Sequence, residues 1–211
     1  MPLPPLPSLP SLPLDIDKVK GFLDAAEGAA LYEAALQCAP RGLCVEIGSY
    51  CGKSSVYIGT ACKQAGGLLV AIDHHRGSEE NQPSELYYDA ELSDGVGGMS
   101  SLATFRETLK AATLEDVVVP MVTSSALAAQ VLTQTLAFVF IDGGHSLAAA
   151  QTDYRLWAGR IMRGGLLAIH DVFPNPADGG RPPYEIYKQA LHSGLFVDAV
   201  SVKSLRILRK L

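Results

Sequence analysis

Acidic side chains recur where the apolar segments of this sequence end. Four of the first five such segments end on a carboxylate or within two residues of one: Glu46, Asp73, Asp142 and Asp171. His145 follows the third of these carboxylates, and His170 directly precedes the fourth. Carboxylates supplemented by water suit Mg²⁺ or Mn²⁺, and an imidazole accepts a proton near neutral pH. The residue types therefore predict a site that joins a divalent metal to acid–base chemistry.

A glycine-containing turn follows the first apolar segment, in the sequence Glu46-Ile-Gly-Ser-Tyr-Cys-Gly52. Gly48 allows the chain to turn sharply and a ligand to approach the backbone. The dinucleotide fingerprint G-x-G-x-x-G is not matched, because Tyr50 stands where its middle glycine would be. A bulky side chain there leaves little room for a pyrophosphate against backbone amides. S-adenosylmethionine has no phosphate, so the turn favours this nucleoside cofactor over a dinucleotide.

Asp73 ends the second apolar segment. A carboxylate at this position can accept both ribose hydroxyls of an adenosyl group. The alternative is a residue that only caps a helix or stabilises a turn. Its place at a strand end and its spacing from the glycine turn together favour ribose binding.

The segments that must position these residues alternate between strands and helices. We expect strands over 43–48, 68–73, 117–122, 137–142, 166–171, 196–202 and 205–208. We expect helices over 15–39 (capped by Asp15), 53–64, 101–112, 126–133, 147–162 and 184–193. Continuous apolar strands separated by helices indicate a parallel sheet covered on both faces. The last two strands are too close in sequence for a parallel crossover and must form an antiparallel hairpin.

The predicted fold class is therefore α/β, a doubly wound Rossmann-like sheet that is mostly parallel with a C-terminal antiparallel hairpin. In such a sheet, ligands bind beyond the carboxyl ends of the strands. The four strand-end carboxylates are thus expected to converge on one rim.

The segment Glu-Ile-Gly-Ser-Tyr-Cys-Gly-Lys-Ser-Ser-Val resembles the first motif of the catechol O-methyltransferase group. The resemblance covers residues 43–171 in the order of elements, which is that of class I methyltransferases. It implies that the turn and the neighbouring serine contact the methionine part of S-adenosylmethionine, and that Ser124 and Ser125 fall where the family contacts adenine. The expected cofactor-binding residues are Glu46, Gly48, Ser49, Tyr50, Gly52, Ser54, Asp73, Ser124 and Asp142.

The second motif departs from the catechol-type pattern. That group has an Asp after the fourth strand, a Lys base three residues later and an Asp-Asn pair after the fifth strand. Asp142 matches the first Asp, His145 stands in place of the Lys, and His170-Asp171 stands in place of the pair. This D-x-x-H and H-D pattern looks closer to the sugar and macrolide O-methyltransferases, where a His at this spacing is the proposed base. The resemblance implies His145 as base and Asp142, His170 and Asp171 as ligands of a divalent metal, Mg²⁺ first.

These residues predict a metal-assisted O-methyltransferase that acts on a small hydroxylated molecule. One alternative is a metal-independent methyltransferase that uses His145 alone. Another is a non-haem iron oxygenase, because two His and a carboxylate can form a facial triad. A third is a non-catalytic S-adenosylmethionine-binding protein. His170 also has the alternative role of a hydrogen-bonded core histidine.

Two segments lie outside the alternating pattern. Residues 1–14 are rich in Pro and Leu, which disfavours helix and central strand, and we expect an N-terminal tail there. Residues 15–211 are expected to form a single domain, because their length and the 48% hydrophobic content suffice for one core. A polar stretch over about 76–100 predicts a lid-like insertion beside the site.

The composition limits the kinds of molecule that the protein is expected to bind. The net charge is −5 and Lys and Arg do not cluster, which argues against nucleic acid and favours a small-molecule substrate. No apolar run is long enough to span a membrane. The four cysteines contain no C-x-x-C pair and are expected to be reduced thiols of a cytoplasmic protein. The helical region over 15–38 is expected either to cover the sheet or to contact a partner. The sequence therefore leaves open whether the protein forms a homo-oligomer.

Overall fold

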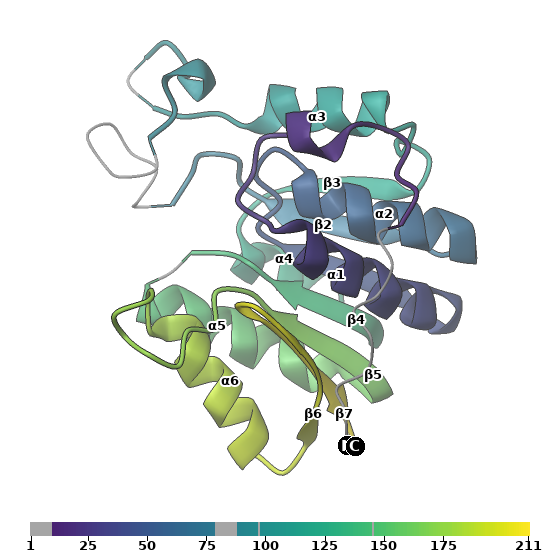
Figure 1. Cartoon of the computed structure of the whole chain (residues 1–211), viewed down its shortest axis with the longest axis vertical. Helices are drawn as coiled ribbons and strands as arrows, with labels where there is room; N and C mark the ends of the chain where they lie inside the picture. Colours follow the sequence, from purple (N-terminus) through teal and green to yellow (C-terminus); the bar gives the residue numbers. More distant parts are fainter. Residues whose placement is uncertain (1–9, 79–87, 97, 145) are drawn as a thin grey trace.

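A twisted sheet runs through the middle of the molecule (Figure 1). The computed structural model describes residues 10–78, 88–96, 98–144 and 146–211. Within these ranges seven strands form one sheet in the order β3-β2-β1-β4-β5-β7-β6. The strands are β1 (Leu43–Ile47), β2 (Leu69–Asp73), β3 (Val118–Val122), β4 (Leu136–Ile141), β5 (Ile161–Ile169), β6 (Phe196–Val202) and β7 (Leu205–Lys210).

The first five strands are parallel, and β7 runs antiparallel to both β5 and β6, between which it lies. This arrangement confirms the predicted doubly wound sheet and its C-terminal hairpin. The strand order reverses between β1 and β4, which are neighbours in the sheet. The carboxyl ends of β1, β2, β4 and β5 therefore meet at a topological switch point, where open α/β sheets bind ligands.

Helices cover both faces of the sheet (Figure 1). They are α1 (Ala25–Cys38), α2 (Lys53–Ala65), α3 (Leu102–Ala111), α4 (Ser125–Val131), α5 (Leu147–Trp157) and α6 (Pro182–His192). The first three pack on one face and the last three on the other, each set over its own buried apolar cluster. Successive residues of β1 alternate between the clusters: Cys44 belongs to the first and Val45 to the second. The helix over 25–38 thus covers the sheet.

The prediction of helix over 15–39 was wrong in its first part. Asp15 caps only a short 3₁₀ turn (Ile16–Lys18), and the chain is then irregular until Asp24 caps α1. Gly21 has a φ of +148°, and a Cβ there would lie 2.9 Å from Cβ of Lys53. This conformation is incompatible with a helix, and the segment passes close to Lys53 at the start of α2 instead.

The helix predicted over 147–162 was also too long. It ends at Trp157 and is followed by one 3₁₀ turn (Ala158–Arg160), and β5 then begins at Ile161. The other boundaries fall within two residues of the expected ones, apart from the start of β5, which lies five residues earlier than expected. All four cysteines are buried and free. No helix in the described part of the chain combines the length and apolarity that a membrane span requires.

Candidate cofactor and metal site

The glycine turn after β1 is fixed by close packing against the loop after β4. Gly48 has a φ of +84°, and a Cβ at this position would collide with the backbone oxygen of Asp142. The two loops are further joined by a hydrogen bond of 2.9 Å from the Asp142 N–H to the Ile47 carbonyl. Any side chain at Gly48 would therefore separate the turn from the β4 rim.

Asp73 holds this turn in shape. Its Oδ2 atom accepts the backbone N–H groups of Ser49 at 2.9 Å and Tyr50 at 2.8 Å, and its Oδ1 atom accepts the N–H of His75 at 2.7 Å. Tyr50 has a φ of +46°, a left-handed conformation that needs such support. A carboxylate has about four acceptor sites, so Asp73 retains acceptor capacity toward the cavity. The turn-stabilising role that the sequence left as an alternative is thus present.

Glu46 lies beneath the turn and is completely buried. It faces α2, where the hydroxyl of Ser55 donates a hydrogen bond to Oε2. Burial is the main cause that raises the pKa of Glu46 to about 8, with smaller contributions from Asp142 and Asp73. Among the described residues, Oε1 of Glu46 and Oγ of the buried Ser49 have no hydrogen-bond partner. Such atoms are costly in a folded protein unless a ligand or water satisfies them.

One cavity of about 1070 Å³ contains nearly all of the predicted site residues. Those that line it are Gly48, Ser49, Tyr50, Ser54, Asp73, Ser124, Asp142, His170 and Asp171. Glu46 and Gly52 stand behind its wall: Glu46 beneath the turn, and Gly52 (φ +93°) at the start of α2, where a Cβ would lie 3.2 Å from Phe105 and Thr108. His145 lies outside the described residues. The cavity is large enough for a nucleoside cofactor and a small second molecule.

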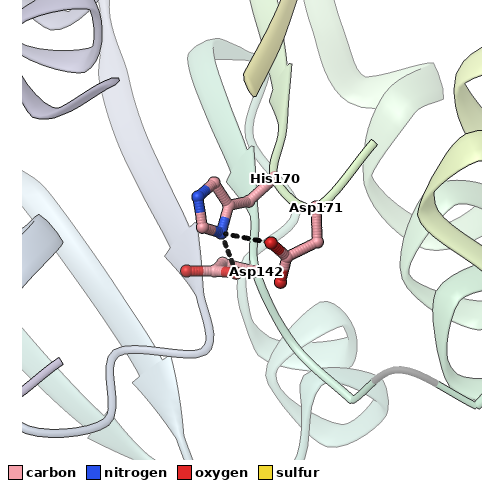
Figure 2. A group of neighbouring side chains, drawn as sticks. All are labelled: Asp142, His170 and Asp171. Carbon is pink, nitrogen blue, oxygen red and sulfur yellow. Dashed lines mark hydrogen bonds and ion pairs between the residues drawn. The ribbon is translucent and has the colours of Figure 1, made fainter. Parts of the chain in front are cut away.

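Asp142, His170 and Asp171, which all line this cavity, point toward one another (Figure 2). One potential ligand atom of each residue lies within 4.8 Å of the others. Nδ1 of His170 is 3.1 Å from Oδ1 of Asp142 and 3.5 Å from Oδ1 of Asp171. Asp171 has a φ of +55°, a left-handed conformation that is uncommon for non-glycine residues. Two carboxylates and one imidazole form a donor set that binds divalent transition metals and Mg²⁺.

The other ring nitrogen of His170 contacts a residue that the sequence did not indicate. Nε2 lies 3.0 Å from Oε2 of Glu27, which belongs to α1 and is only 3% exposed. Burial alone would lower the pKa of His170, but the charge of Asp142 and the hydrogen bonds to Asp142 and Glu27 raise it to about 11. The D-x-x-E spacing of Asp24 and Glu27 is a capping-box signal that identifies the helix start. It does not reveal the contact with His170.

The N-terminal segment and the insertion meet at the mouth of the cavity. Lys20 and Phe22 line it, and the Phe22 ring lies 6.0 Å from the ring of Tyr50. Nζ of Lys20 is 2.6 Å from Asp89 and 2.5 Å from Glu91, both in the insertion. These two ion pairs link the described part of the predicted lid to the chain segment before α1.

Buried side chains of the insertion also pack on the glycine turn. Leu92 and Met99 form a small apolar cluster with Cys51, and Ser93 and Met99 pair in an antiparallel bridge. The described part of the insertion is therefore folded against the turn. Residues 79–87 and 97 of the predicted lid lie outside the described residues.

A family model described as "Methyltransferase domain" matches residues 45–172, more than half of the chain. The fold is similar to those of several solved methyltransferases at low identity. The O-methyltransferase TomG from Streptomyces achromogenes, in complex with SAM, shares 16% identity with a TM-score of 0.61, over 90% of this chain and 81% of that chain. An O-methyltransferase from Bacillus cereus in complex with SAH shares 14% with a TM-score of 0.60, over 90% and 83%.

SAH-bound PaMTH1, a methyltransferase from Podospora anserina, shares 13% identity with a TM-score of 0.62, over 90% of this chain and 80% of that chain. Likenesses at this level of identity concern the fold, whereas the family match spans the glycine turn and the Asp142, His170 and Asp171 cluster. The chain belongs to this methyltransferase domain family.

Proposed function

We propose that this chain is an S-adenosylmethionine-dependent O-methyltransferase that acts on a small hydroxylated molecule with the help of a divalent metal. Mg²⁺ is the first candidate for this metal. The observation that carries the proposal is that the glycine turn with Asp73 and the cluster of Asp142, His170 and Asp171 line one cavity. Neighbours in fold are O-methyltransferases whose structures contain SAM or SAH.

The polar atoms of the turn fit such a cofactor. When bound, S-adenosylmethionine supplies a methyl group on a positively charged sulfur. Ser49 lines the cavity, and its buried Oγ has no hydrogen-bond partner among the described residues. Ser49 is the proposed contact for the amino-acid part of the ligand. Asp73 retains acceptor sites for ribose hydroxyls. Ser124, at the start of α4, lies on the same wall and is the proposed adenine contact.

The cluster of Asp142, His170 and Asp171 on the wall of the same cavity fits a divalent ion. Asp142, His170 and Asp171 would hold it, and it would lower the pKa of a substrate hydroxyl. His145, three residues after Asp142, is the proposed base that takes the hydroxyl proton. This assignment rests on the sequence pattern alone.

Asp142 belongs both to the junction with the glycine turn and to the proposed metal cluster. Its backbone oxygen packs against Gly48 and its N–H bonds to Ile47, while its side chain faces His170. The backbone junction at Asp142 thus helps to hold the cofactor turn and the metal cluster at a fixed separation. Holding two reactants at a fixed separation lowers the entropic cost of their reaction.

The proposal is tested by methyl-transfer assays on a panel of phenols, sugars and hydroxy acids, with the protein loaded with Mg²⁺ and after complete removal of metal by a chelator. We expect transfer that disappears on chelation and returns with Mg²⁺. Activity that survives chelation and falls in His145→Ala would identify a metal-independent enzyme instead. Binding of S-adenosylhomocysteine with no transfer to any acceptor would indicate a non-catalytic binding protein.

A further inference from the structure

The two carboxylate oxygens of Glu27 have separate partners. Oε1 accepts three hydrogen bonds from the β6–β7 turn: 2.9 Å from Ser204 N–H, 2.8 Å from the Ser204 hydroxyl and 3.1 Å from Leu205 N–H. Oε2 lies 3.0 Å from Nε2 of His170 and accepts a longer bond, 3.3 Å, from the Asp24 N–H. One oxygen thus anchors Glu27 to a rigid turn, and the other faces the site.

The contact constrains His170. With Nε2–H donated to Glu27, the ring presents Nδ1 to Asp142 and Asp171 (Figure 2). A histidine that binds a metal through one ring nitrogen usually donates the other N–H to a carboxylate or carbonyl, which fixes the ring and its tautomer. Both side chains are almost fully buried, at 6% and 3% exposure, so water cannot replace either partner.

We infer that Glu27 is the positioning residue of the metal cluster: it holds His170 so that Nδ1 faces the ion-binding position between Asp142 and Asp171. Glu27 acts through His170 and is not itself a ligand. This inference rests on the proposed metal-dependent function and adds to it a residue on α1, outside the segment that the family model matches.

The Glu27→Gln variant distinguishes the roles of the two carboxylate oxygens. The three donors of the β6–β7 turn require an acceptor, so the glutamine oxygen is expected to take the place of Oε1. The amide NH₂ then faces His170 Nε2–H, donor against donor, and the preferred ring orientation is lost. The Ser204→Ala variant is the matched control, because it removes a bond to Oε1 and leaves Oε2 and His170 untouched.

The experiment is a calorimetric titration of Mn²⁺ into the full chain saturated with S-adenosylhomocysteine, for wild type, Glu27→Gln, Ser204→Ala, His170→Asn and the Glu27→Gln/His170→Asn double variant. We expect Glu27→Gln to weaken Mn²⁺ binding about 10- to 100-fold and Ser204→Ala to leave it within about twofold while lowering the melting temperature. In the His170→Asn background, Glu27→Gln should have no additional effect on Mn²⁺ affinity.

The affinity for S-adenosylhomocysteine, measured first for each variant, reports whether the fold and the cofactor turn are intact. Unchanged Mn²⁺ affinity in Glu27→Gln would overturn the inference, as would an equal loss in Ser204→Ala or a full additional loss in the double variant. A wild-type chain that binds S-adenosylhomocysteine but not Mn²⁺ would overturn the metal site and this inference with it, while the cofactor site would stand.

Discussion

His170 and Glu27 are 143 residues apart in sequence, yet Nε2 of one lies 3.0 Å from Oε2 of the other. The contact joins the end of β5 to the first turn of α1, across the face of the sheet that α1 covers. The residues proposed to bind metal are therefore positioned from two sides, by their own strands and by the N-terminal helix. The same principle of dual support applies to the cofactor turn, which Asp73 holds from β2 and Asp142 from β4.

Replacing Asp73 by Ala should affect both binding and stability. The change removes the acceptor of three backbone N–H groups, and we expect a loss of about 2–4 kcal/mol in the free energy of unfolding. Affinity for S-adenosylhomocysteine should fall at least about tenfold, because the turn and the ribose contact are both lost. Urea unfolding and calorimetry measure the two effects. A variant with wild-type stability would refute the turn-holding role.

Replacing Asp142 by Asn should separate metal binding from cofactor binding. The amide keeps the shape of the side chain and the backbone junction with Gly48, but it removes one anionic ligand. We expect Mn²⁺ affinity to fall on the order of a hundredfold, turnover to be lost, and affinity for S-adenosylhomocysteine to stay within about twofold. Calorimetry and a methyl-transfer assay provide the three values. Retained Mn²⁺ affinity would exclude Asp142 from the metal site.

Glu46→Gln should change how stability depends on pH. Burial raises the pKa of Glu46 from 4.5 to about 8, so the folded chain keeps a proton that the unfolded chain loses. The stabilisation that the protonated Glu46 carboxyl gives to the folded wild-type chain is complete below pH 4.5 and is lost as the pH rises to about 8. The neutral amide does not titrate. Between pH 5 and pH 9 the free energy of unfolding of the variant should therefore rise by a few kcal/mol relative to that of wild type. Urea unfolding at pH 5, 7 and 9 tests this, and parallel profiles for the two proteins would contradict it.

Gly48→Ala should disrupt the junction between the two halves of the site. The left-handed φ of +84° and the collision with the Asp142 carbonyl oxygen both oppose a methyl group, and we expect at least about 2 kcal/mol of destabilisation. Gly159→Ala is the control, because a Cβ there meets nothing within 4 Å. Affinity for S-adenosylhomocysteine should fall in the first variant and persist in the second. If the two variants have the same free energy of unfolding and the same affinity for S-adenosylhomocysteine, the contact between Gly48 and Asp142 does not determine the conformation of the turn.

The sequence predicted the sheet and most of the cavity wall because both depend on local signals. Apolar runs and their spacing define β1 to β5, and the parallel arrangement brings Asp73, Asp142 and Asp171 to one rim. The glycine turn is recognisable from its residue types alone.

Contacts between distant segments were not predictable in this way. Glu27 has an ordinary capping-box spacing, and only the packing of α1 on the sheet brings it to His170. Lys20 and Phe22 line the cavity on either side of Gly21, whose φ of +148° interrupts the expected helix. The turn-holding role of Asp73 and the burial of Glu46 beneath the turn likewise depend on three-dimensional packing.

The most direct test is a crystal structure of the chain with S-adenosylhomocysteine and Mn²⁺, in which anomalous scattering locates the metal. We expect the nucleoside between Tyr50, Asp73 and Ser124, its sulfur facing the Mn²⁺ position, and one Mn²⁺ bound by Asp142, His170 and Asp171. A nucleoside bound elsewhere, or a sulfur that points away from the Mn²⁺ position, would contradict the claim that methyl donor and acceptor meet in this cavity.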